Sequence, residues 1–103
     1  MAKVEILIVC SDEGILNTII RLIKNNPDWN PAGAANFQEA NELLTENAFN
    51  IVLIGSGLSA EDERELQLTV VSSQKNIAVI KHYGGGSGLL FGEIFEALSR
   101  LNR

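Results

Sequence analysis

The sequence predicts an α/β domain in which a four-stranded parallel sheet lies between two layers of helices. Short runs of branched apolar residues recur along the chain, and each is followed by a longer stretch with apolar residues at helical spacing. The connections between these stretches are short. Strands that alternate with helices in this way pair in parallel, with right-handed crossovers and helices on both faces. We expect the segment 1–103 to form one domain, since 103 residues suffice for a single core.

The strands are predicted at four segments: 4–10, 29–35, 50–54 and 77–80. Three of them are rich in Val, Ile and Leu, which is typical of strands buried on both faces of a sheet. The second is weaker and contains Pro31, which donates no backbone hydrogen bond, so it should lie at an edge. The third runs directly into Gly55, at the end of the sheet where α/β folds usually bind ligands.

A helix is expected after each strand, and small polar residues at its start can cap it. The predicted caps are Ser11, Asn36 together with Glu39, Ser59 and Ser87. The predicted apolar faces are Ile15, Leu16, Ile19, Ile20, Leu22 and Ile23; Phe37, Ala40, Leu43 and Leu44; Leu66, Val70 and Val71; and Leu89, Leu90, Phe91, Ile94, Phe95, Leu98 and Leu101.

Composition restricts the possible partners. The formal net charge is −5, from 13 acidic and 8 basic residues, which disfavours nucleic acid or an anionic membrane as the main partner. Cys10 is the single cysteine, and the amino-terminal residues show no signal-peptide pattern, so we expect a cytoplasmic protein. No residue pattern calls for a metal or another cofactor.

Three segments, 6–9, 32–44 and 49–54, together resemble the receiver domains of two-component response regulators, which have the flavodoxin-like fold. The first is followed by an acidic turn, the second runs from small residues into a helix, and the third corresponds to the strand that ends in the phosphoacceptor aspartate of the family. The resemblance covers residues 3–83 and implies the strand order 2-1-3-4.

The residues that carry the chemistry of the family are replaced here. The phosphoacceptor position falls on Gly55, and the acid pair that binds a divalent cation falls on Cys10 and Ser11, with Asp12 as the nearest carboxylate. The serine or threonine of the switch falls on Tyr83. The fifth strand, with its lysine, is missing. A phosphoryl acceptor needs a carboxylate nucleophile and oxygen ligands for Mg²⁺.

The resemblance therefore implies a pseudo-receiver: a non-enzymatic module of signal transduction that is not phosphorylated and acts through protein–protein interaction.

Two alternatives remain open. Cys10 follows a strand and precedes a helix, as does the phosphocysteine of sugar-phosphotransferase IIB proteins, so it could be a phosphocarrier. A glycine-rich segment before the last helix could bind a small anion or a nucleotide through its backbone amides. The candidate residues of this second site are Lys81, His82, Gly84, Gly85, Gly86 and Ser87, within a segment that extends to Gly88.

The last helix is apolar over more of its surface than packing on one sheet requires. Without a fifth strand, the fourth strand would also be an uncovered edge. We therefore expect a homodimer that buries Phe91, Phe95, Ile77 and Val79.

Overall fold

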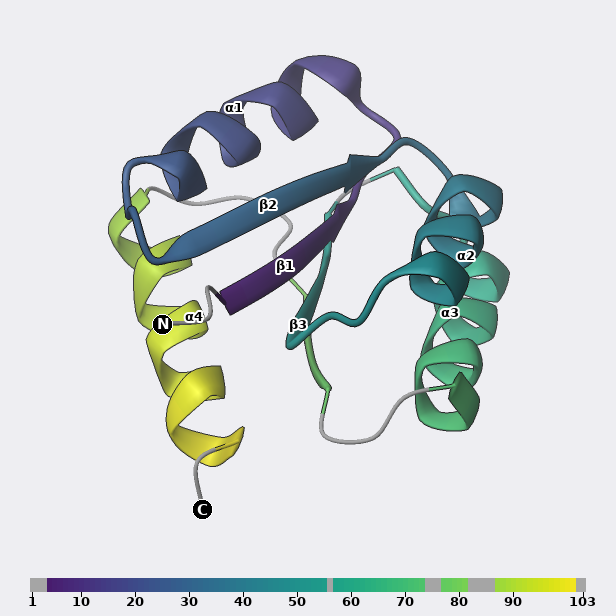
Figure 1. Cartoon of the computed structure of the whole chain (residues 1–103). Coiled ribbons are helices and arrows are strands. Elements are labelled where there is room, and N and C mark those ends of the chain that lie inside the picture. Colours follow the sequence, from purple (N-terminus) through teal and green to yellow (C-terminus); the bar gives the residue numbers. More distant parts are fainter. Residues whose placement is uncertain (1–3, 56, 74–76, 82–86, 102–103) are drawn as a thin grey trace.

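A computed structural model describes residues 4–55, 57–73, 77–81 and 87–101. The elements follow one another as predicted, strand then helix throughout. They are β1 (Val4–Val9), α1 (Glu13–Lys24), β2 (Trp29–Ala34), α2 (Phe37–Glu46), β3 (Ile51–Ile54), α3 (Ala60–Ser73), β4 (Ala78–Lys81) and α4 (Ser87–Leu101) (Figure 1).

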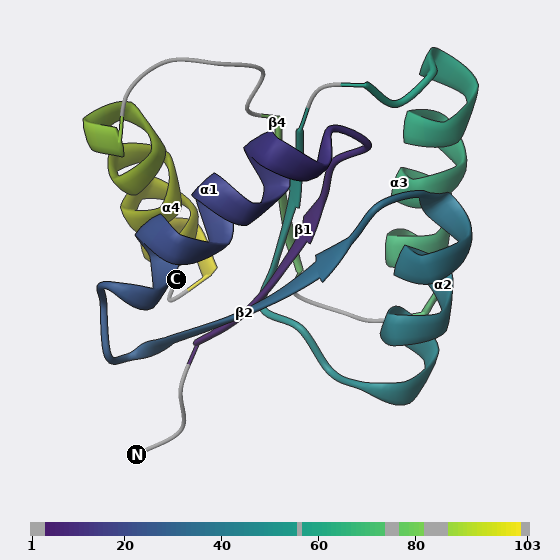
Figure 2. The ribbon, with the colours of Figure 1, turned by 90° about the horizontal axis from the view of Figure 1, so that it is seen from above.

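The strands form one parallel sheet in the order β2-β1-β3-β4, which confirms the predicted order. Helices α1 and α4 cover one face of this sheet, and α2 and α3 cover the other (Figure 2). Successive residues of β1 alternate between the two cores: Ile6 and Ile8 face α1 and α4, whereas Leu7 and Val9 face α2 and α3. All four side chains are fully buried, which explains why a central strand such as β1 needs an uninterrupted apolar sequence.

All four predicted strands have at least one end that shifts by one residue, and β2 stops at Ala34 instead of residue 35. β1 stops at Val9 instead of residue 10, β3 begins at Ile51 instead of residue 50, and β4 covers 78–81 instead of 77–80. β2 lies at one edge of the sheet, as the proline within it required.

The predicted cap of α1 is wrong by one residue. Asp12, not Ser11, occupies the cap position, and its carboxylate oxygen accepts a hydrogen bond of 3.0 Å from the backbone N–H of Ile15. Serine and aspartate are both good caps, so the residue type alone did not distinguish the two positions. The caps at Asn36 and Ser59 are confirmed, since each side-chain oxygen accepts a hydrogen bond from the backbone N–H three residues later.

Two residues predicted to face the core are exposed. Ile15 is 43% exposed in α1, and Val71 is 79% exposed in α3. In both helices the buried stripe is narrower than the apolar pattern: α1 buries Leu16, Ile19 and Ile23, and α3 buries Leu66 and Val70.

Candidate functional site

The carboxyl ends of β1 and β3 place Cys10 and Gly55 next to each other. The backbone N–H of Cys10 donates to the carbonyl of Ala34 at 3.0 Å, and that of Gly55 donates to the carbonyl of Val9 at 2.7 Å. Both bonds extend the sheet by one residue beyond the strand ends. The two residues are therefore held by the backbone at the edge where a parallel sheet usually carries its chemistry.

Cys10 fills the space beside Gly55. A Cβ atom at position 55 would lie 2.9 Å from Cys10 Cβ and 3.0 Å from Cys10 Sγ, which is closer than ordinary van der Waals contact. Cys10 has no exposed surface, and Gly55 is also buried. This backbone geometry thus leaves no room for any side chain at the position that resembles the phosphoacceptor.

A second contact joins the same two loops. Gly57 has a φ of 98°, in the left-handed region that favours glycine, and a Cβ atom there would overlap Ser11 Oγ. Ser11 is exposed. The β1–α1 loop and the β3–α3 loop therefore close on each other through two pairs of small residues, Cys10 with Gly55 and Ser11 with Gly57. The glycine-rich break after β3, which includes Gly57, was visible in the sequence, but its contact with Ser11 was not.

Asp12, the nearest carboxylate, is the capping group of α1, and its carboxylate is exposed. The thiol of Cys10 donates a long hydrogen bond, 3.6 Å, to the carbonyl oxygen of Asp12, so the loop between them is held by its own atoms. Within the described segments, no group of three or more His, Cys, Asp or Glu residues is placed to hold a metal ion.

The structure describes only part of the candidate anion site. Lys81, the last residue of β4, has its Nζ 3.7 Å from Oε1 of Glu63 in α3, and its side chain is 51% exposed. Ser87 begins α4, although its side chain lies outside the described part of the chain. His82, Tyr83, Gly84, Gly85 and Gly86 also lie outside it, so the anion site and the switch position stay predictions.

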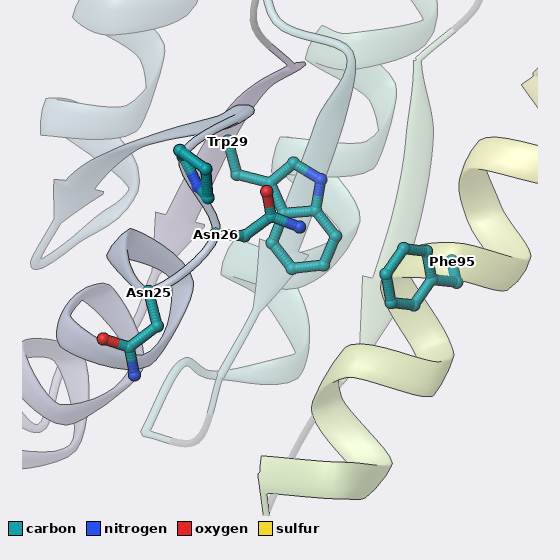
Figure 3. Close-up of a pocket in the computed structure, with 5 residues that line it drawn as sticks. Asn25, Asn26, Trp29 and Phe95 are labelled. Carbon is teal, nitrogen blue, oxygen red and sulfur yellow. The ribbon is translucent and has the colours of Figure 1, made fainter.

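Phe95, predicted to lie in a dimer interface, packs against Trp29. The ring centroids are 5.2 Å apart and the planes are tilted by 56°, and Phe95 is still 56% exposed. The two rings help to line a hollow of about 390 Å³, together with Asn25, Asn26 and Pro27 from the turn before β2 (Figure 3). Trp29 pairs with Val4 at the amino ends of β2 and β1, so this hollow lies at the opposite end of the sheet from Cys10 and Gly55.

The other predicted interface residues lie near β4. Ile77 and Val79 are half-buried and pack against the core between the sheet and the α2–α3 layer. The side chain of Phe91 is outside the described residues. Among the helices described, none is long and apolar enough to cross a membrane.

No family model matches the sequence. A search of curated proteins also finds no match. Solved structures do match, and three of them are receiver domains.

The signal receiver domain of an HD domain-containing protein from Pseudomonas fluorescens Pf-5 has a TM-score of 0.69 and 15% identity, over 97% of this chain and 98% of that one. The non-phosphorylated HemR receiver domain from Leptospira biflexa has a TM-score of 0.67 and 22% identity, over 96% and 94%. A CheY-like response regulator receiver domain protein from Methanospirillum hungatei JF-1 has a TM-score of 0.70 and 16% identity, over 98% of both chains. The likeness extends over almost the whole of each chain, and it shows that this protein has the fold of receiver domains.

Proposed function

We propose that this protein is a pseudo-receiver, a non-enzymatic signalling module that is not phosphorylated and acts by binding other proteins. The observation that carries the proposal is the contact between Cys10 and Gly55 at the carboxyl end of the sheet. A phosphoacceptor there would need a carboxylate within reach of Mg²⁺ and of the phosphodonor. A buried glycine packed on a buried thiol provides neither the nucleophile nor the space for one.

The exposed surface supports the second half of the proposal. Among the side chains that the structure describes, four large apolar ones are substantially exposed: Ile15, Leu68, Val71 and Phe95. They lie on three helices, α1, α3 and α4, and the two on α3 are one turn apart. Leu68 and Val71 therefore give α3 an exposed apolar pair, which suits a protein–protein contact.

The burial of Cys10 argues against the phosphocarrier alternative. A cysteine that accepts a phosphoryl group must be reached by the donor and must expose its thiolate. Cys10 is fully buried, and the acidic residues Asp12 and Glu13 follow it, where a phosphoryl group would need hydrogen-bond donors and positive charge.

The anion-sensor alternative draws on Lys81, whose ammonium group already faces the carboxylate of Glu63. An anion would have to compete with that carboxylate. This alternative rests mainly on the glycine-rich segment and has less support than the pseudo-receiver.

The test is incubation of the purified protein with acetyl phosphate and Mg²⁺, followed by intact-mass spectrometry. A receiver domain with its phosphoacceptor aspartate serves as the positive control under the same conditions. We expect a phosphoryl adduct on the control and none on this protein. An adduct on this protein would contradict the proposal, and its persistence or loss in Cys10→Ala would separate a carboxylate acceptor from the thiol.

A further inference from the structure

The two edges of the sheet differ in their capacity to accept another strand. In a parallel strand the N–H and C=O of one residue point to the same side, and successive residues alternate between the two sides. An edge strand therefore directs every second residue's backbone groups away from the sheet. Which residues these are follows from the hydrogen bonds on the inner side.

The β2 edge is blocked by proline. The carbonyls of Asp28 and Ala34 accept hydrogen bonds from the N–H groups of Val4 and Cys10, so the even-numbered residues of β2 face β1. The outward residues are Trp29, Pro31 and Gly33. Pro31, at the centre of this edge, has no N–H to donate, which prevents regular pairing with another strand.

The β4 edge has no such block. The N–H of Ala78 donates to the carbonyl of Asn50 at 3.1 Å, so Ala78 and Ile80 face β3. The outward residues are therefore Ile77, Val79 and Lys81, and each has a backbone donor and acceptor. Within the described residues, the structure shows no hydrogen bond to any of these outward groups.

One row of side chains on helix α3 lies near β4. Glu63, Gln67 and Val71 are spaced by four residues and so lie in one row along the helix. The ion pair between Glu63 and Lys81 brings the Glu63 end of that row to the carboxyl end of β4. Because α3 runs antiparallel to β4, Val71, which is 79% exposed, lies at the same end of the sheet as Ile77. The open edge is thus bordered by an apolar residue at one end and a closed ion pair at the other.

We propose that the outer edge of β4 pairs with β4 of a second copy of this chain, antiparallel and centred on Val79, so that the two sheets become one. The outward residues are placed symmetrically about Val79, which makes the edge complementary to itself. Val79 would exchange both of its hydrogen bonds with Val79 of the second copy, and Ile77 would pair with the second copy's Lys81. The charge of Lys81 is already balanced by Glu63 within its own copy. A two-fold axis therefore brings no unpaired charge into the interface.

This pairing would also cover Val71, the exposed apolar residue of α3. The aliphatic stem of each Lys81 would lie across Ile77 and near Val71 of the other copy, while its ammonium group stays beside Glu63. The proposal does not depend on whether the domain is phosphorylated. Phe95 is not part of the proposed pairing. Its ring packs on Trp29, the first residue of the strand at the other edge of the sheet.

Two variants test the register of the pairing by cross-linking. In an antiparallel hydrogen-bonded pair the Cα atoms are about 5.5 Å apart, within the range that a disulfide spans. Under mild oxidation Val79→Cys should form a covalent dimer across the two-fold axis. Lys81→Cys is the matched control: it lies on the same edge and is more exposed, yet it would be roughly 13 Å from its own copy. If disulfides formed only by random collision, the more exposed Lys81→Cys would give more covalent dimer than Val79→Cys. The proposed pairing predicts the reverse.

Sedimentation equilibrium of the whole chain provides the second readout. We expect a concentration-dependent dimer in the wild type. Val79→Pro, which copies the blocked β2 edge, should raise the dimer dissociation constant at least about tenfold, because it removes two central hydrogen bonds. Circular dichroism checks that this variant folds; if it does not, the comparison of the two cysteine variants still decides. A wild type that stays monomeric at high micromolar concentration, or equal cross-linking of both cysteine variants, would overturn the proposal.

Discussion

Replacing Gly55 with alanine should destabilise the fold, although the change adds only one methyl group. The new Cβ would lie 2.9 Å from Cys10 Cβ and 3.0 Å from Cys10 Sγ, with no room to move because both residues are buried and held by backbone hydrogen bonds. Overpacking of this kind costs about 1–3 kcal/mol. A typical domain is stable by about 5–15 kcal/mol, so the loss should be easy to measure without unfolding the protein.

The cause of that loss is tested by removing the neighbour. In a Cys10→Gly background both close contacts disappear, and the nearest remaining atom is the carbonyl oxygen of Val9 at an ordinary 3.5 Å. Gly55→Ala in this background should be neutral or stabilising by about 0.4–1 kcal/mol, because alanine lowers the entropy of the unfolded chain. The double-mutant cycle should therefore give a coupling of at least about 1 kcal/mol, whatever Cys10→Gly costs alone.

Urea unfolding followed by circular dichroism measures all four proteins of the cycle. With a urea dependence of about 1–3 kcal/mol per molar, a loss of about 2 kcal/mol lowers the midpoint by roughly 1 M. Gly92→Ala is the matched control, since Gly92 is exposed in α4 and a Cβ there would have no heavy atom within 4 Å. It should raise the stability by about 0.5–1 kcal/mol. The same cost of Gly55→Ala in both backgrounds would refute the packing argument.

Two further predictions concern the cap of α2 and the thiol. Asn36→Ala should cost about 1 kcal/mol in thermal unfolding, because the Asn36 side chain accepts from the N–H of Glu39 at 2.9 Å, whereas Asn36→Asp should keep most of the stability. Iodoacetamide should alkylate Cys10 at least about a hundredfold more slowly in the folded protein than in urea, since a fully buried thiol reacts only after an opening that costs several kcal/mol. Fast alkylation of the folded protein would favour the phosphocarrier after all.

The sequence was sufficient for the fold because strand and helix patterns agreed along the whole chain. Three apolar runs of strand length and a weaker fourth segment, each followed by a stretch with an apolar helical face, permit few topologies. Pro31 alone placed β2 at an edge, and the structure confirms this. The capping of α2 was equally visible, since Asn36 and Glu39 have complementary roles: Glu39 in return accepts a hydrogen bond from the N–H of Ala35 at 2.9 Å.

The errors fall where tertiary packing decides between equal local choices. Ser11 and Asp12 are both suitable caps, and the helix begins after the second. Ile15 and Val71 extend apolar stripes on their helices, but the sheet covers only the middle of each stripe and leaves them exposed. Local pattern carries no information on how wide a stripe the opposing layer can bury.

The site shows the same limit. In the sequence, Cys10 and Gly55 are two separate departures from the pattern of receiver domains. The register of β1 with β3, in which Val9 lies beside Ile54, makes them neighbours, and only this pairing shows that one fills the space of the other. Contact between residues 45 positions apart was not visible in either local segment.

That contact also bears on whether phosphoacceptor chemistry could be restored by substitution. An aspartate at position 55 would require the side chain at position 10 to become smaller, because a Cβ alone already meets Cys10 within 3.0 Å. A cation site would require a carboxylate at position 10 or 11, which is larger than the cysteine or the serine now present. The same conflict recurs at the second pair, where Ser11 occupies the space beside Gly57. The two requirements oppose each other on this backbone, so the loops after β1 and β3 would have to move apart before both carboxylates could fit. The small residues of the two loops are fitted to each other, and they would be expected to change together.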